Sequence, residues 1–198
     1  MGAPTKKQKE MRKMSKILFC RVAYMNNYDL DIVSDVPQNG GAYVRETGDA
    51  GEKINFHDFN DGLIYGFVET RGDLKNKPYQ IHIERIEAQA GESLDGVHIV
   101  FCAKDPSDNK TKVVGWYRYA TIFRHQQHLV HNGCSYPYFF KDEFKNSVLI
   151  SPEERNIFVP TTQADGYGMG QTNVWYADKD DERIRVFVHN VLVAMGEA

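Results

Sequence analysis

The segment from Gly166 to Asp178, GYGMGQTNVWYAD, holds the residue types most suited to chemistry. Its alternating glycines leave backbone N–H groups that can face an anion, but no Gly-Lys-Ser/Thr follows, so it is not a P-loop. Gln171, Asn173 and Trp175 come next, before the carboxylate of Asp178. Amides read base edges, rings stack on bases and a carboxylate can activate water. The pattern indicates a nucleobase ligand; the alternative is a glycine loop with a packed tryptophan and an aspartate that caps a helix.

A second cluster of polar and aromatic residues lies in KINFHDFND, residues 53–61, which contains Asn55 and Phe56. The preceding NGGAYV contributes Tyr43. We expect a polar wall over an aromatic floor. Because Asx residues beside glycine also form turns, a tied-down loop is the alternative.

A third cluster, GWYRYATIFRH, reads as part of a strand over 112–124. Alternate strand residues share a face, so Trp116 and Arg118 lie on one side and Tyr117 on the other. One face must serve the core. The other could offer stacking rings, and guanidinium groups such as that of Arg124, to DNA.

Metal or thiol chemistry is not expected. His125, His128 and His131 form HxxHxxH, a spacing that fits no established zinc pattern. The three cysteines are far apart and form no CxxC pair, so neither a disulfide framework nor a thiolate site is indicated. We therefore predict no metal and no cofactor.

Charge and composition divide the chain into an arm and a body. Residues 1–16 carry six basic residues and one acidic residue, although the 198-residue chain has a net charge of −3. We expect a flexible basic arm over 1–16, whose Lys6 and Lys7 contact DNA phosphates, and a single recognition domain over 17–198. With 41% hydrophobic and 26% charged residues, wholesale disorder is excluded. No apolar run is long enough to span a membrane and no secretory signal is visible, so we expect a cytoplasmic protein.

Short strands dominate the elements that must position these clusters. Apolar or alternating runs predict strands at 17–23, 63–70, 80–86, 97–104, 112–124, 136–140 and 147–150. A helical turn is expected at 151–155 and a terminal helix after Asp178. The fold class is therefore mainly β (α+β), a curved or closed antiparallel sheet with short peripheral helices and a C-terminal helix. Missing βαβ alternation argues against a Rossmann or TIM fold.

The blocks INF, GLIYGFVE, IHIERI, VVGWYRYATIFRH, PEER and GMGQTNVWYAD, taken together, resemble a module at the N-terminus of predicted bacterial restriction endonucleases of the HNH type. The resemblance runs from about Leu18 to Asp178. It implies a PUA-like fold of the EVE or SRA type and the sensing of modified DNA bases. In those relatives a nuclease follows the WYAD block, whereas about twenty residues and no HNH motif follow here. That departure implies either a partner nuclease or chemistry of the module's own.

Three functions stay open. The first is an anti-phage DNA glycosylase that flips out and excises a hypermodified cytosine, with Asp178 as the carboxylate that stabilises the oxocarbenium-like sugar and Asn55 holding the base or water. The second is a non-catalytic reader that recruits a nuclease, and the third is a protein-interaction module. For the first two, the base pocket is expected to contain Tyr43, Phe56, Trp116, Tyr117, Gln171, Asn173 and Trp175, with Lys6, Lys7, Arg118 and Arg124 on the DNA backbone.

Overall fold

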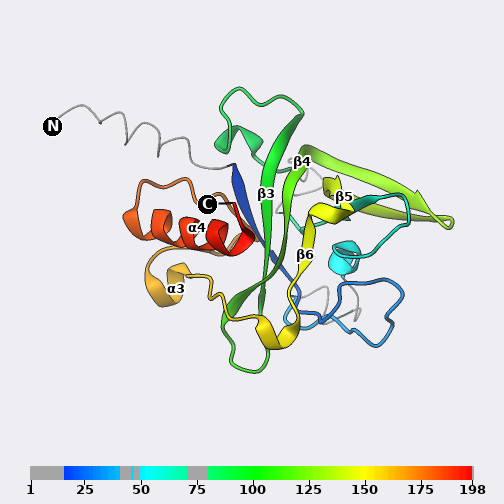
Figure 1. Cartoon of the computed structure of the whole chain (residues 1–198), viewed down its shortest axis with the longest axis horizontal. Helices are drawn as coiled ribbons and strands as arrows, with labels where there is room; N and C mark the ends of the chain where they lie inside the picture. Colours follow the sequence, from blue (N-terminus) through cyan, green and yellow to red (C-terminus); the bar gives the residue numbers. More distant parts are fainter. Residues whose placement is uncertain (1–15, 41–45, 47–49, 71–79, 198) are drawn as a thin grey trace.

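The computed structural model describes residues 16–40, 46, 50–70 and 80–197. Within them, seven strands form one open, mixed sheet in the order β2-β5-β4-β3-β1-β7, with β6 beside β5 along the same edge of β4 (Figure 1). The strands are β1 (Ile17–Val22), β2 (Leu63–Gly66), β3 (Ser93–Lys104), β4 (Thr111–His131), β5 (Cys134–Glu143), β6 (Ser147–Leu149) and β7 (Val174–Trp175). The mainly β prediction is confirmed.

The sheet corrects the expectation of purely antiparallel pairing. β1 runs parallel to β3, with Ile17 opposite His98 and Val22 opposite Ala103. Residues between these two strands supply the long connection that a parallel pair requires. β2 and β7 form the two ends of the strand order, so the described sheet does not close.

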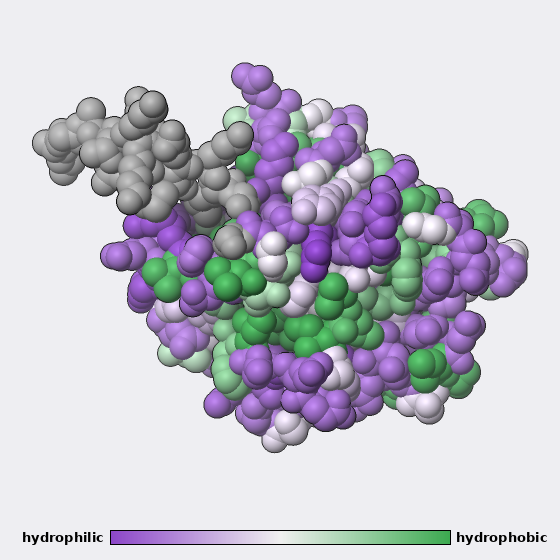
Figure 2. Space-filling view, in the orientation of Figure 1, coloured by the Kyte–Doolittle hydropathy of each residue, from purple (hydrophilic) through white to green (hydrophobic). Residues whose placement is uncertain are grey.

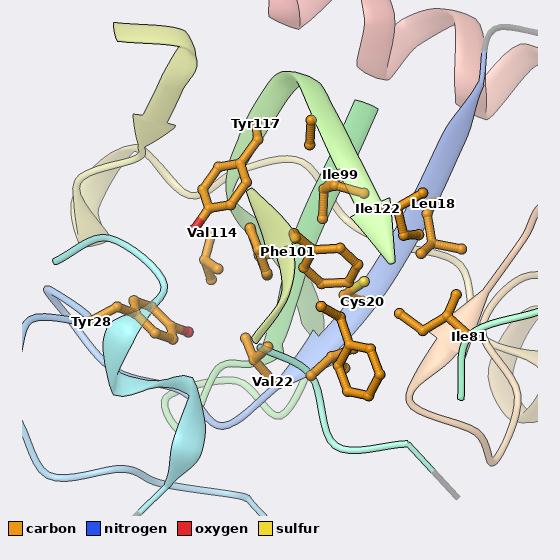
Figure 3. Close-up of a cluster of buried hydrophobic side chains, with 14 of the residues drawn as sticks. Leu18, Cys20, Val22, Tyr28, Ile81, Ile99, Phe101, Val114, Tyr117 and Ile122 are labelled. Carbon is orange, nitrogen blue, oxygen red and sulfur yellow. The ribbon is translucent and has the colours of Figure 1, made fainter. Parts of the chain in front are cut away.

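Two hydrophobic cores lie on opposite faces of the sheet because successive strand residues point to opposite sides. Leu18 and Cys20 of β1 join Phe101 of β3 in the larger core (Figure 3). Phe19 of β1 and Val100 of β3 point to the other face and belong to the second core. Because both faces of β1 and β3 are buried, the sequences of these strands are nearly continuous apolar runs.

The C-terminal helix α4 (Glu182–Met195) covers the second core with Ile184, Val188 and Val191. It begins after Asp181, whose side chain accepts a hydrogen bond from the Arg183 N–H, so Asp181 and not Asp178 is the N-cap. The predicted terminal helix is confirmed. On the surface, hydrophobic residues gather between α4 and β6 (Figure 2). No helix in the described ranges is long and apolar enough to cross a membrane.

The remaining elements are short and local. The predicted strand at 80–86 is instead the 3₁₀ helix η2 (Ile83–Arg85), preceded by a single bridge at Gln80. Three more 3₁₀ turns are η1 (Gly51–Ile54), η3 (Phe144–Asn146) and η4 (Pro152–Glu154), the last of which confirms the predicted helical turn. The short helix α3 (Thr162–Asp165) precedes the glycine segment.

Candidate functional site

Asn55 lies in the core, with none of its surface exposed. Its side-chain Nδ2 donates to the Phe67 carbonyl oxygen (3.0 Å), and the Phe67 N–H donates to its Oδ1 (2.7 Å). The Tyr117 hydroxyl donates to its backbone carbonyl. The amide therefore satisfies the backbone of a neighbouring segment, as a strand partner would. This placement corrects the expectation that Asn55 faces a reacting base or water.

The predicted aromatic walls do not meet in one pocket. Phe56 and Tyr117 pack in the larger core, whereas Trp116 and Trp175 pack in the core beneath α4. Trp116 and Tyr117 are neighbours on one strand, so the pleat sends their rings to opposite faces. The prediction that these four rings converge is therefore wrong, because each face of the sheet packs against its own hydrophobic core and uses two of the rings there.

The two predicted phosphate-binding arginines of β4 are placed differently. Arg124 donates from Nη1 to Glu84 (2.5 Å) and from Nη2 to the Gly91 carbonyl (3.0 Å), so its guanidinium is already engaged. Arg118 is partly buried, and its Nε has no hydrogen-bond partner among the residues that the structure describes. Tyr43, Lys6 and Lys7, which were also predicted to bind DNA, lie outside those residues.

The glycine segment forms a tight turn next to β7. Gly168 has a φ of +93°, and a Cβ there would lie 2.1 Å from the Pro160 carbonyl oxygen, so only glycine fits. The Met169 N–H donates to that same carbonyl, and Arg21 donates to the Gly170 carbonyl. The Met169 N–H is thus used within the fold; anion binding by the other N–H groups of the segment stays a prediction.

A cleft with a volume of about 160 Å³ lies where the end of this segment meets η2. We call it the Arg85 cleft; its walls are Thr70, Gln80, His82, Arg85, Thr172, Asn173, Val174 and Tyr176. Asn173 is thus the predicted pocket residue that the cleft contains, while Gln171 is exposed outside it. The volume is below the roughly 300–1,000 Å³ of usual ligand pockets, so it suits one small group.

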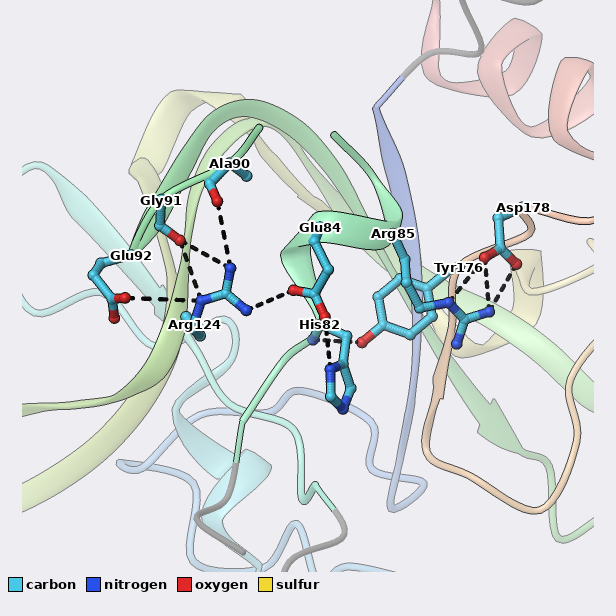
Figure 4. Close-up of polar contacts among 9 residues, drawn as sticks. All are labelled: His82, Glu84, Arg85, Ala90, Gly91, Glu92, Arg124, Tyr176 and Asp178. Atoms are coloured by element: carbon cyan, nitrogen blue, oxygen red, sulfur yellow. Dashed lines mark hydrogen bonds and ion pairs between the residues drawn. The ribbon is translucent and has the colours of Figure 1, made fainter. Parts of the chain in front are cut away.

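Arg85 is held in a fixed orientation at the cleft wall (Figure 4). Its Nε and Nη2 donate to the two carboxylate oxygens of Asp178, at 2.9 and 2.8 Å. The guanidinium carbon lies 4.1 Å from the centre of the Tyr176 ring. With 46% of the Arg85 side chain exposed, the guanidinium offers a planar, positively charged surface to solvent.

Tyr176 links this surface to η2. The His82 N–H donates to the Tyr176 hydroxyl oxygen at 2.8 Å. Burial of the ring raises the pKa of Tyr176 to about 12. The hydroxyl is therefore neutral at pH 7 and acts as a structural acceptor, not as an acid or base.

A second ion pair supports η2 from the other side. Arg124 of β4 holds Glu84, and this hydrogen bond lowers the pKa of the Glu84 carboxyl to about 2. His82 Nδ1 lies 2.9 Å from the same carboxylate. Glu84 thus connects η2 to β4 through Arg124. Arg85 connects the same turn to Asp178, in the segment after β7.

Acid is expected to remove the contribution of Glu84 to stability. Its pKa is lower in the folded protein than in the unfolded chain, so the stabilisation is complete above about pH 4.5 and disappears as the pH falls toward 2. The free energy of unfolding by urea, measured between pH 5 and 2.5, should be higher for wild type than for Glu84→Gln, and the two should converge on acidification. Parallel curves over this range would contradict the pairing.

The sequence did not single out the central residues of the cleft. Arg85 was part of a predicted strand, IHIERI, and its partner Asp178 is 93 positions away. No spacing rule connects such residues. Tyr176 lies between two predicted site residues, Trp175 and Asp178. Its aromatic side chain in that position was the signal that could have identified it.

Residues able to hold a metal lie elsewhere. Among the described residues, ligand atoms of Asp29, Asp31 and His57 lie within 4.8 Å of one another. His57 Nδ1 is 2.7 Å from Asp29 Oδ1. These two side chains therefore form a hydrogen bond without a metal, and Asp31 supplies a second carboxylate nearby. His128 and His131 lie on the regularly paired end of β4, where a spacing of three places them on opposite faces.

Comparison of the chain with protein-family models, curated proteins and solved structures found no match in any of the three.

Proposed function

We propose that the protein reads a modified base in DNA and that the Arg85 cleft receives the modified group. The main support is the guanidinium of Arg85, fixed between Asp178 and Tyr176 with its outer side open. Arginine planes stack on unpaired bases, and amides such as that of Asn173 bind base edges. A PUA-like fold of the EVE or SRA type is part of this proposal; a mainly β sheet is compatible with it.

The hydrogen bonds of Asp178 favour the reader over the glycosylase. Both of its carboxylate oxygens accept hydrogen bonds from Arg85, so Asp178 is less available to a water or sugar than an unpaired carboxylate would be. A glycosylase needs a carboxylate close to the developing positive charge. Excision of a hypermodified cytosine is kept as the second function because 31% of the Asp178 side chain is exposed, so its carboxylate can be reached from solvent. A reader would act with a separate nuclease.

Binding and base release can be measured on the same duplexes. Fluorescence anisotropy should be recorded with one sequence that carries cytosine, 5-methylcytosine, 5-hydroxymethylcytosine or its glucosylated form. We expect a modified duplex to bind at least about tenfold more tightly than the unmodified one, a difference of about 1.4 kcal/mol. Equal affinity for all four duplexes would contradict the proposal.

Alkali treatment of the same reactions separates the two functions. A reader leaves no alkali-labile site in any duplex. If wild type creates such sites, Asp178→Asn should lower the rate at which they form by about 10²–10⁴-fold, since the substitution removes the charge but keeps the shape. Asp180→Asn is the matched control, because Asp180 is exposed and pairs with Arg185 outside the cleft.

A further inference from the structure

Thr70 lines the Arg85 cleft and carries a buried hydroxyl that is not used in any described hydrogen bond. Only 7% of the residue is exposed, and its Oγ1 has no hydrogen-bond partner among the residues described. Buried hydroxyls nearly always have a partner, because water no longer solvates them. An unpaired hydroxyl in a cleft wall is a group that a ligand can satisfy.

Three other polar side chains of the cleft are already engaged at one atom or more. The Thr172 hydroxyl donates to the Val174 carbonyl at 2.9 Å. Asn173 Nδ2 donates to the Glu69 carbonyl at 3.1 Å. Arg85 is bound to Asp178 on two nitrogens. These three side chains therefore shape the cleft, whereas Thr70 contributes a hydrogen bond that nothing described here uses.

We infer that the cleft selects a base substituent that carries an oxygen, either a hydroxyl or a sugar, over a plain methyl group. This inference rests on the proposed function and concerns the same site. A hydroxyl both donates and accepts, so Thr70 can pair with an alcohol or an ether oxygen. In the described rotamer Oγ1 is buried, so this bond requires a rotation about χ1 to another staggered well, in which Oγ1 reaches the bound group.

A methyl group cannot make this bond. It would fill the space and leave the Thr70 hydroxyl without a partner. Sites that are built to hydrogen-bond a substrate hydroxyl discriminate strongly against the analogue that lacks it, for this reason. The preference should therefore appear as a difference between two duplexes that differ in one oxygen atom.

The test compares 5-hydroxymethylcytosine with 5-methylcytosine in one duplex sequence, by anisotropy, for wild type and variants. Wild type should prefer the hydroxymethylated duplex by about tenfold. Thr70→Val keeps the shape but lacks the hydroxyl, and it should reduce the ratio of the two affinities to about one. Thr70→Ser keeps a hydroxyl and should retain the preference.

Thr172→Val is the matched control, since its hydroxyl lies in the same cleft but already donates within its own loop. It should leave the ratio unchanged. A thermal melt of each variant checks folding, and Thr70→Val should melt no lower than wild type because it removes a buried group without a partner. The serine variant keeps the test decisive if the valine variant does not fold.

Two failures are distinguishable. If wild type binds modified and unmodified duplexes equally, the proposed function fails and this inference fails with it. If wild type prefers modified duplexes but does not distinguish hydroxymethyl from methyl, the inference alone is wrong. The inference is also wrong if Thr70→Val keeps the full preference, because the hydroxyl is then not the selecting group.

Discussion

Replacing Arg85 with glutamine is expected to lower the affinity for a duplex with a modified cytosine by about 10- to 100-fold, or about 1.4–2.8 kcal/mol. Glutamine is polar but offers no cationic plane over Tyr176 and cannot hold both oxygens of Asp178. Stacking is worth about 1–3 kcal/mol per base, and the released carboxylate would repel phosphates. Anisotropy with the hydroxymethylated duplex measures the change.

Arg183→Gln is a closely matched control. Arg183 lies 4.5 Å from the centre of the Tyr167 ring and pairs with Asp181, so it repeats the arrangement of Arg85 at a separate cleft of about 390 Å³. Exposed pairs contribute only about 0–1 kcal/mol to stability, so both variants should fold. Similar losses of affinity in the two variants would mean that the Arg85 cleft is not the specific site of DNA binding.

Replacing Asn55 with alanine is expected to destabilise the fold by about 2–5 kcal/mol, because the N–H and the carbonyl of Phe67 each lose a buried partner. The alanine also leaves a small void among buried side chains. Urea unfolding followed by fluorescence measures the loss.

Asn190→Ala provides the comparison, as Asn190 is exposed on α4 and alanine favours a helix. Its stability should match or slightly exceed that of wild type. A stable Asn55→Ala protein that has lost only its DNA-dependent function would restore the predicted role of Asn55 at a base.

The elements were predictable where one pattern had one structural meaning. The apolar runs of β1 and β3 are buried on both sides, and the acids before α4 include its true N-cap, Asp181. The 80–86 segment misled because Ile81 and Ile83 alternate with polar residues, as in a strand. In the structure its Arg85 N–H bonds to the His82 carbonyl, so the backbone turns locally instead of joining the sheet.

The site was predictable only in part, since residue type does not tell a buried amide from a binding one. Asn55 and Asn173 looked alike in the sequence, yet one completes the core and the other lines the cleft. The partner of Asp178 is likewise set by the fold and not by spacing, because η2 brings Arg85 to it across the sheet edge. Trp116 and Trp175 were predicted to face a base, but their rings fill the core beneath α4.

The parallel pairing of β1 with β3 determines the order in which the chain can assemble. During synthesis β1 leaves the ribosome first but must wait for roughly 80 residues before its partner is made, which takes about 4–16 s at ordinary translation rates. For that time an apolar strand, ILFCRV, has no neighbour. Lys16, directly before it, and Lys13, four residues before it, are the kind of charged flank that keeps such a strand from pairing with another chain. A charged flank of this kind acts before the sheet is complete, so its effect does not depend on what the finished protein binds.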